Sequence, residues 1–350
     1  MLDFAFSADG LAFINDLQAE KLKNVIVEEG DVLLNITGDS VARACMVDKK
    51  YLPARVNQHV CIVRADLQKA VPSYLLYFLQ LNKEYLLQLA AGGATRNALT
   101  KEMINNLELE LPSIEDQQKI TAILDDIQAR MDCNNAINEN LLQQTQALYK
   151  NRFVDLKPFD GEMPPDWRLG TVSEIIELHD SKRIPLSSRE RANLAKIYPY
   201  YGATSVMDYV DRYLFDGIYL LLGEDGTVVD SKGFPILQYV EGKFWVNNHA
   251  HIITGKNGFT VETLYLLFSL TNVQSIVTGA VQPKISQGNL NKVSVVIPSE
   301  AALSAFNSIV QPIFAHIRNL RAENDRLAAT RDTLLPRLMS GELDVSSLDI

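Results

Sequence analysis

The chain has 350 residues, of which 47% are hydrophobic and 22% are charged, a composition that is ordinary for a globular protein of two or three domains. No apolar run reaches the roughly 18 residues that cross a membrane, no secretory signal opens the chain, and a net charge of −10 argues mildly against a generally basic nucleic-acid binder. Cys45, Cys61 and Cys133 form neither a disulfide framework nor a metal motif, so we expect buried thiols in a reducing cytoplasm.

Residues 1–112 alternate short apolar runs with polar loops. Strands are predicted at residues 30–36, 42–47 and 60–63. Leucines at helical spacing follow over 72–89, and a glycine-bearing loop occupies 91–97. Leucine and glutamate alternate over 107–111, as in a half-exposed strand. This order of elements predicts a mixed α/β domain.

A second domain of the same kind is predicted over residues 167–298. Residues 155–166 precede it and are rich in proline and glycine, so they cannot continue a helix and mark a linker. Within the second domain, strands are predicted at 217–222, 250–253 and 293–297, a helix at 261–270 and a second glycine loop at 279–285.

A long helix is predicted after each domain, at residues 113–154 and 299–340, with a tail at 341–350. In the second helix, apolar residues recur every seven positions at Phe306, Ile313, Leu320, Leu327 and Leu334. Subtracting 186 from these numbers gives Ile120, Ile127, Asn134, Leu141 and Leu148 in the first helix. Pro112-Ser113 and Pro298-Ser299 provide the same start signal. Pro312 is expected to kink or divide the second helix.

The two halves of the chain also align at other points, always in the same order. Asn57-Gln58-His59 matches Asn247-Asn248-His249, and Leu99-Thr100 matches Ile285-Ser286. This internal repeat predicts duplicated α/β (mixed α+β) domains. The segment that opens the second domain, from Trp167 onward, has no counterpart in the first. Domain 1–112 is therefore expected to be incomplete at its N-terminus.

Because a whole domain separates the two long helices, they can pair as an antiparallel coiled coil. Such a pair would be a rigid spacer that holds the two domains apart. Pairing from centre to centre would place Asn134 near Leu320, where a polar residue costs stability and specifies the register. In the alternative, each helix packs only on its own domain.

No catalytic residue is predicted. The chain has no GxxxxGK[ST] loop that would hold ATP phosphates. His249 and His251 would share one face of a strand, but no third ligand at motif spacing accompanies them, so no metal site is expected. Tyr198-Pro199-Tyr200-Tyr201 lacks the amide and the second proline of the loop found in amino-methyltransferases, and no glycine-rich cofactor loop accompanies it.

Polar and aromatic loop residues are better explained by contact with nucleic acid. Five cations between Lys182 and Lys196 accompany one acid, Glu190, and this local excess of +4 suits contact with phosphates. In the second domain the candidate DNA contacts are Lys182, Arg183, Tyr200, Tyr201, Asn247, Asn248, Gln282 and Lys284. In the first domain they are Arg43, Asn57, Gln58, Thr95, Arg96 and Asn97.

Each of these residues also has a simpler interpretation. Any single one could be a solvated loop residue, and a run of charges is often only a wet face. His59 and His249 could be core histidines that backbone groups satisfy. The glycines Gly93 and Gly279 could permit tight turns without touching a ligand.

Four phrases, taken in order, resemble a known family. They are Gly30-Asp31-Val32-Leu33-Leu34-Asn35-Ile36-Thr37-Gly38, Leu111-Pro112-Ser113-Ile114-Glu115-Asp116-Gln117-Gln118, Leu221-Leu222-Gly223-Glu224-Asp225-Gly226 and the loop 279–285. Together with the duplicated domain and long helices, they resemble the specificity subunit of type I restriction–modification systems, over essentially the whole chain.

The resemblance implies two target-recognition domains, each of which reads one half of a bipartite double-stranded DNA site in the major groove. It also implies two modification subunits that carry S-adenosylmethionine and methylate adenine at N6, and motor-nuclease subunits that use ATP and Mg. This chain would then hold no cofactor. A spacer of roughly 55 Å would limit the half-site separation to about one and a half turns of DNA. The alternative is a truncated homologue that sequesters modification subunits without reading DNA.

Overall fold

The computed structural model describes residues 3–8, 10–92, 97–279 and 281–348. The chain divides into two compact units: unit 1 is Met1–Asn135 with Arg321–Ile350, and unit 2 is Ala136–Leu320. In the part of the chain that the structure describes, no helix is long and apolar enough to cross a membrane. Cys45 is buried and burial raises its thiol pKa to about 11, whereas Cys133 is exposed, so the prediction of three buried thiols is wrong.

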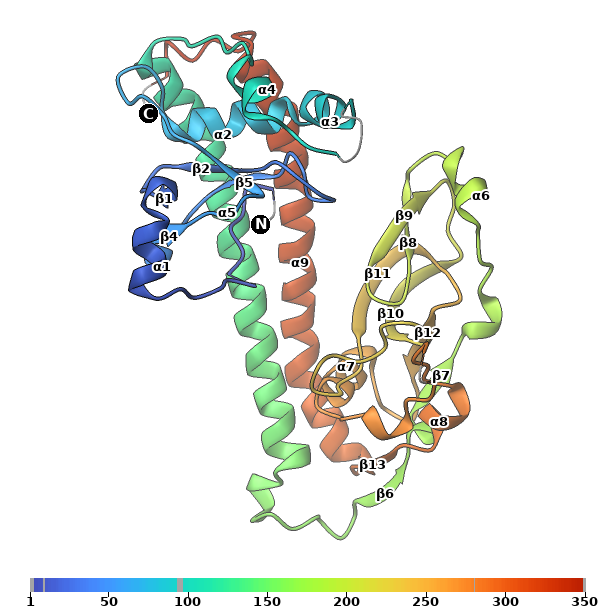
Figure 1. The fold of residues 1–350 in the computed structure, drawn as a ribbon. Helices are drawn as coiled ribbons and strands as arrows, with labels where there is room; N and C mark the ends of the chain where they lie inside the picture. The colour runs from blue at the N-terminus through green and yellow to red at the C-terminus, as the bar shows by residue number, and fades with distance from the viewer. Residues whose placement is uncertain (1–2, 9, 93–96, 280, 349–350) are drawn as a thin grey trace. The chain divides into compact units, whose positions relative to one another are not determined.

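Unit 1 is built on a three-stranded antiparallel sheet in the order β3-β2-β5 (Figure 1). All four residues of the central strand are buried because both of its faces are covered. Val32 and Leu34 pack with the helix α2, whereas Leu33 packs with Val27 and Cys45 on the other face. The strands of unit 1 are β1 (Ile26–Val27), β2 (Val32–Asn35), β3 (Ala44–Met46), β4 (Ala54–Arg55) and β5 (Val60–Val63). Its short helices are α1 (Asp16–Lys21), α2 (Pro72–Leu81), α3 (Lys83–Ala91) and α4 (Lys101–Asn105).

Unit 2 contains a six-stranded mixed sheet in the order β7-β12-β10-β11-β8-β9. The strand β10 is antiparallel to both neighbours, and β8 joins β11 in parallel. The helix α7 covers one face, where Leu264 and Phe268 pack with Leu220 and Leu222. The strands are β6 (Arg168–Thr171), β7 (Ile176–Leu178), β8 (Tyr198–Tyr201), β9 (Val206–Val210), β10 (Phe215–Gly223), β11 (Leu237–Val246), β12 (Ala250–Gly255) and β13 (Ser294–Ile297). The short helices are α6 (Ser188–Ala192), α7 (Val261–Ser269) and α8 (Gln287–Asn291).

The same backbone hydrogen bonds close the central strand of each unit. In unit 1, the Ile36 N–H donates to the His59 carbonyl at 2.8 Å, and the Leu99 N–H donates to the Ile36 carbonyl at 2.8 Å. In unit 2, the corresponding bonds join Glu224 to His249 at 2.8 Å and Ile285 to Glu224 at 2.9 Å. The next residue along the chain then caps a short helix in both units, through the Thr100 or Ser286 hydroxyl.

Residues 107–111 of unit 1 form no strand, so that prediction is wrong. Their counterpart in unit 2, β13, pairs antiparallel with β6. Among the described residues of unit 1, no segment pairs with 107–111. The alternating leucines mark a face that packs, but a strand also needs a neighbour for its backbone groups.

The two long helices are α5 (Ile114–Tyr149) and α9 (Glu300–Met339). A single helix continues through Pro312, so of the two predicted effects of this proline, a kink or a division, the division does not occur. Within unit 1 the helices run antiparallel, because Asn134 bonds Asn324 at 2.9 Å while Gln128 bonds Arg331 at 3.1 Å. The partner of Asn134 is therefore Asn324 and not Leu320, a difference of one helical turn.

The predicted heptad positions are buried to different degrees. Ile120, Asn134, Phe306 and Leu320 are buried, and Ile127, Leu141, Ile313, Leu327 and Leu334 are half-buried. Leu148 is 45% exposed, whereas its neighbour Tyr149 is 5% exposed and packs against Phe306 with ring centroids 5.7 Å apart. A straight helix drifts by about 20° per heptad against a seven-residue repeat, and four heptads are enough to turn Leu148 outward.

Candidate functional site

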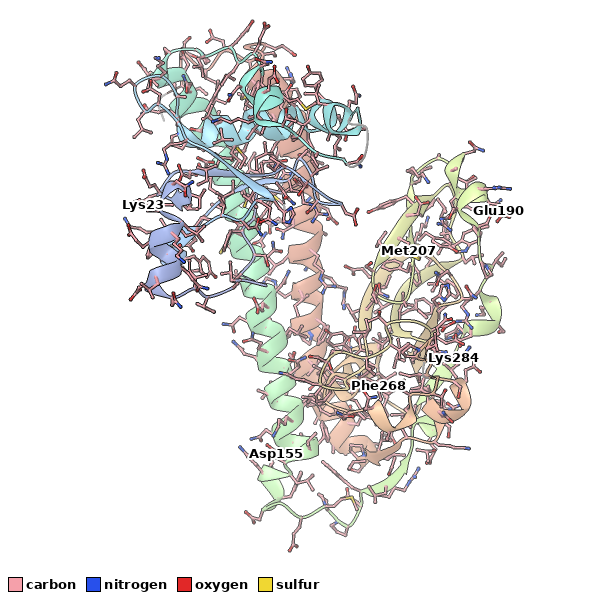
Figure 2. All side chains as sticks on the ribbon, in the orientation of Figure 1. Lys23, Asp155, Glu190, Met207, Phe268 and Lys284 are labelled. Atoms are coloured by element: carbon pink, nitrogen blue, oxygen red, sulfur yellow. The ribbon has the colours of Figure 1, made fainter. Side chains whose placement is uncertain are left out.

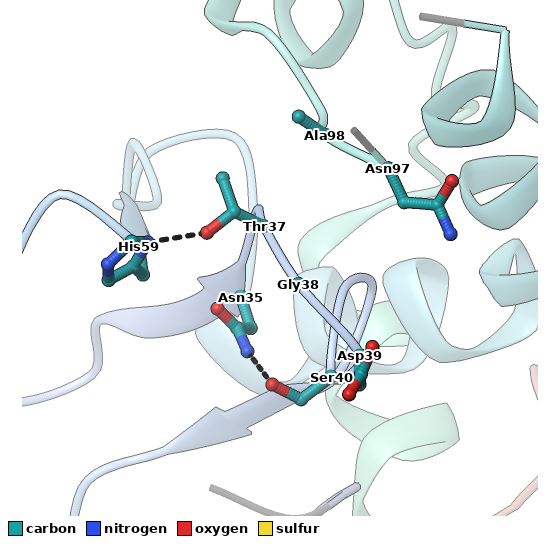
Figure 3. A pocket seen from close by; sticks show the side chains of 8 residues that line it. All are labelled: Asn35, Thr37, Gly38, Asp39, Ser40, His59, Asn97 and Ala98. Carbon is teal, nitrogen blue, oxygen red and sulfur yellow. Dashed lines mark hydrogen bonds between the residues drawn. The ribbon is translucent and has the colours of Figure 1, made fainter. Parts of the chain in front are cut away.

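Polar side chains line a pocket of about 690 Å³ at the end of the central strand of unit 1. Figure 3 shows the loop that follows β2 on one side and Asn97 and Ala98 on the other. His59 Nδ1 lies 2.6 Å from Thr37 Oγ1, and the Asn35 amide donates to the Ser40 hydroxyl. The pocket residues are Asn35, Thr37, Gly38, Asp39, Ser40, His59, Asn97 and Ala98.

The sequence predicted part of this pocket. Asn97 lies in it, and Asn57 and Gln58 are exposed beside His59. The Asn57 side-chain oxygen accepts the His59 N–H at 2.9 Å, and Gln58 lies 3.3 Å from His59 Nε2. His59 is exposed, so its interpretation as a core histidine is wrong. Arg43 is half-buried, and Thr95, Arg96 and Gly93 lie outside the described residues.

The corresponding place in unit 2 holds a network of ion pairs. The buried His251 ring lies with Nδ1 2.6 Å from Asp180 Oδ2 and Nε2 2.7 Å from the Ile285 carbonyl. Arg183 Nη1 donates to Glu224 at 2.5 Å, and Lys284 Nζ lies 3.3 Å from the same carboxylate. Three separate segments, which precede β8, follow β10 and precede α8, are therefore tied together by charge.

Hydrogen bonds determine the charge of Asp180 in this network. Both nitrogens of His251 face hydrogen-bond acceptors: Nε2 lies beside the Ile285 carbonyl and Nδ1 beside the Asp180 carboxylate. Burial raises the pKa of Asp180, but hydrogen bonds from His251, the Ile252 N–H and Gln287 outweigh it and hold that pKa below its usual range. Asp180 is therefore deprotonated at neutral pH.

Asp180, Glu224 and His251 each place one ligand-type atom within 4.8 Å of the others. No acid stands at motif spacing from His251 in the sequence, and the fold brings two acids to it from distant segments. The arrangement nevertheless favours an ion-pair network over a metal centre. A guanidinium already lies 2.5 Å from Glu224, and both nitrogens of His251 are engaged.

Two predicted DNA contacts of unit 2 lie inside the domain. Tyr200 is 1% exposed, and its hydroxyl accepts the Leu186 N–H at 2.9 Å while the Arg191 guanidinium covers its ring. Asn247 is 4% exposed, and its side-chain oxygen accepts the His249 N–H at 2.8 Å. The prediction that Tyr200 and Asn247 contact DNA is therefore wrong, because both side chains are buried and bond to the backbone of their own domain. His249 is partly exposed, so it is not a core histidine.

The remaining candidates of unit 2 reach the surface to different degrees. Lys182, Asn248, Gln282 and Lys284 are exposed, Tyr201 is half-buried, and Arg183 lies largely buried in the ion network. The buried Asn247 amide lies 3.2 Å from the sulfur of Met207. Figure 2 shows Met207 well apart from the exposed candidate Lys284. The exposed candidates therefore come mainly from the turn before β12 and the glycine loop.

The basic run of residues 182–196 is largely neutralised by acids from elsewhere in unit 2. Arg191 and Lys196 lie 2.9 Å and 2.8 Å from Asp208, and Arg183 pairs with Glu224. Hydrogen bonds from Lys196, the Tyr209 N–H and Arg191 lower the pKa of Asp208 to about 2. The positive charge excess of residues 182–196 is thus smaller in the folded domain than in the sequence. Lys182 and Arg189 are among the cations of this run that are exposed.

Comparison with known proteins gives these sites a context. The family model described as the type I restriction modification DNA specificity domain matches residues 7–143 and 164–327. The MjaIX specificity subunit of a type I restriction enzyme of Methanocaldococcus jannaschii is 27% identical over an alignment of 309 positions, which covers 79% of this chain and 71% of that protein. The HindI specificity subunit of Haemophilus influenzae is 21% identical over an alignment of 413 positions, gaps included, which covers 94% of this chain and 90% of the relative.

A solved structure supports the fold independently. The crystal structure of a type I restriction–modification S subunit from M. genitalium matches with a TM-score of 0.51 at 18% identity, covering 90% of this chain and 84% of the other. Because the family model matches two segments that together make up most of the sequence, the chain belongs to the type I restriction modification DNA specificity family.

Proposed function

We propose that the chain is a non-catalytic DNA-specificity subunit that recognises a bipartite target through two similar domains. The observation that carries the proposal is the pair of backbone hydrogen bonds that both units make at the residue after the central strand, Ile36 after β2 and Glu224 after β10. We call these bonds the backbone frame. The frame is the same in both units, but the side chains that it presents differ. Two similar frames with different polar groups suit the recognition of two different half-sites.

The exposed side chains around each frame have the chemistry that base recognition needs. Asn57, Gln58 and Asn97 of unit 1 provide amide donors and acceptors, as do Asn248 and Gln282 of unit 2. Lys182 and Arg189 suit contact with phosphates, which would position unit 2 without reading sequence. The negative overall charge makes such local cations important for binding.

The helices α5 and α9 are the proposed spacer. With 36 and 40 residues at about 1.5 Å each, they measure about 54 and 60 Å. At about 3.4 Å per base pair, that length corresponds to about one and a half turns of DNA. The proposed partners are two modification subunits, which methylate adenine at N6 with S-adenosylmethionine, and motor-nuclease subunits, which use ATP and Mg. The specificity subunits among the relatives support this assignment.

Genome-wide mapping of methylated adenine tests the proposal. The full chain would be co-expressed with the modification subunit from the same locus, and a split recognition sequence is the expected result. The double variant Asn248→Ala/Gln282→Ala should relax or change one half of that sequence only. The matched variant Asn57→Ala/Gln58→Ala should affect the other half, so each variant controls for the other.

Two outcomes would contradict the proposal in different ways. A methylation sequence that neither double variant alters would show that these loops do not read DNA. A stable complex with the modification subunit that methylates nothing would instead identify a sequestering protein, the second function that the sequence leaves open.

A further inference from the structure

Residues 108–111 of unit 1, which we name the acceptor segment, correspond to a paired strand in unit 2. The offset of 186 that relates Leu99 to Ile285 also relates this segment to β13. In unit 2, β13 pairs with β6 in the register Ser294↔Thr171, Val295↔Gly170, Val296↔Leu169 and Ile297↔Arg168. Among the described residues, no strand pairs with the acceptor segment.

The acceptor segment packs on unit 1 by one face only. Leu109 contacts the cluster of Tyr74 and Tyr77, and the Glu110 carbonyl accepts the Tyr74 hydroxyl at 3.3 Å. Glu108 and Glu110 point to solvent, and Leu111 is 41% exposed. The segment is thus held on one side by Leu109 and by the Glu110 carbonyl, and no strand of the described residues pairs with its other edge.

Two hollows flank the segment, both within unit 1. One, of about 400 Å³, is lined by Glu108 and Leu109 together with Phe78 and Pro336. The other, of about 380 Å³, is lined by Glu110 and Leu111 together with Ile120 and Val345. The two hollows thus border the two ends of the acceptor segment.

We propose that the acceptor segment binds an extended strand supplied by another polypeptide, by the same antiparallel pairing that β6 makes in unit 2. Unit 2 specifies the pattern of that strand. Trp167 directly precedes β6, is 5% exposed and packs against Phe153 and Phe159. A large aromatic residue therefore fixes the N-terminal end of the strand. A Cβ at Gly170 would meet the tip of the Ile297 side chain at 2.3 Å, so a small residue three positions later avoids displacing that side chain.

The charge of the acceptor segment specifies the partner further. In the β6 register, Glu108 and Glu110 would lie opposite the positions of Thr171 and Leu169. The unit 2 residues at the two Glu positions are the uncharged Ser294 and Val296. Opposite charges across an antiparallel pair are favourable. The fitting partner is therefore a strand that begins with an aromatic residue, has a small residue three positions later, and carries basic residues at the two positions that face the glutamates.

Two labelled peptides test the proposal against the full chain. The first copies residues 165–176, and the second carries Leu169→Lys and Thr171→Lys within it. Leu169 is 65% exposed in unit 2, so the lysine there removes little apolar contact. Fluorescence anisotropy should show that both bind, the lysine peptide about threefold to tenfold more tightly. Hydrogen exchange should slow at alternate amides of residues 108–111, those that face the added strand.

Charge reversal on the chain provides the control. The variant Glu108→Lys/Glu110→Lys, checked by circular dichroism for folding, should lose the preference for the lysine peptide. A Gly170→Pro peptide should not bind to either chain. The proposal is overturned if no peptide protects residues 108–111, or if the proline peptide binds as well. Protection that appears without peptide and grows with chain concentration would overturn it in favour of a second copy.

Discussion

The buried pair of Asp180 and His251 joins segments that lie 71 residues apart in the sequence. Asp180 also accepts the Ile252 N–H at 2.8 Å and the Gln287 amide at 2.5 Å, so a single carboxylate serves three partners. Removing a charge from such a network leaves the others buried and unpaired. Asp180 therefore matters more for holding the loops of unit 2 than its place in a basic run suggests.

Asp180→Asn should lower the free energy of unfolding by about 3 kcal/mol at pH 7. The folded-state pKa of Asp180 lies below 3.8, so its stabilising effect is present above that pH and is lost as the pH falls further. The difference between variant and wild type should shrink below about pH 4. Urea unfolding followed by tryptophan fluorescence measures this, because both tryptophans, Trp167 and Trp245, lie in unit 2.

The exposed Asp216 provides the control, as Asp216→Asn removes a carboxylate from the same sheet. It should leave the unfolding curve nearly unchanged. Equal stability of the Asp180 variant and the wild type at pH 7 would refute the role assigned to the network.

Sequence alone predicted the residue types of the site better than their partners. The exposed Asn57, Gln58, Asn248 and Gln282 follow from polar loops beside predicted strands. The burial of Tyr200 does not follow, because it depends on Arg191 and Leu186, which only the folded domain brings against the ring. A local count of charges could not include Asp208 or Glu224, which arrive from other strands.

For the helix α5, too, the sequence predicts some properties and not others. Its existence and bounds follow from the sequence to within a few residues, since the prediction was 113–154 and the helix is Ile114–Tyr149. The buried face at its end does not follow, because a seven-residue count slips against 3.6 residues per turn. Tyr149 and Phe153, rather than Leu148, pack on Phe306.

Tyr149→Ala should therefore lower the free energy of unfolding of unit 2 by about 3 kcal/mol or more, because it leaves a cavity beside Phe306 and Phe153. The neighbouring Leu148→Ala, at an exposed position, should lower it by less than about 0.5 kcal/mol. Thermal unfolding monitored by tryptophan fluorescence compares the two directly. A larger effect at Leu148 than at Tyr149 would restore the heptad assignment.

For the whole molecule, the proposed spacer makes a quantitative prediction. The segments 128–134 and 324–330 face each other in unit 1, as the bonds from Gln128 and Asn134 show. Duplicating both segments adds one heptad to each helix, about 10.5 Å, without changing the pairing. The gap between the methylated half-sites should grow by about three base pairs while the half-sites themselves stay the same.

Methylation mapping of this variant provides the measurement, and duplication in one helix only is its control, because it would mismatch the pair and should reduce methylation. An unchanged gap with both duplications present would show that the helices do not set the half-site separation.

The match of His59 with His249 and of Leu99 with Ile285 could be predicted from the sequence, and each matched pair makes the same backbone hydrogen bonds. The missing pairing of residues 107–111 could not, since it depends on a neighbour and not on the alternating leucines.

The frame that closes β2 and β10 is made of main-chain atoms, at Ile36, His59 and Leu99 in one unit and Glu224, His249 and Ile285 in the other. Main-chain bonds impose few demands on the side chains that they carry, and the two units already tolerate an isoleucine and a glutamate at the same place. Mutations of the exposed loop side chains, outside the ion-pair network of unit 2, can therefore accumulate at little cost to folding. Such a frame allows new DNA specificities to evolve by loop exchange, while the rest of the protein stays unchanged.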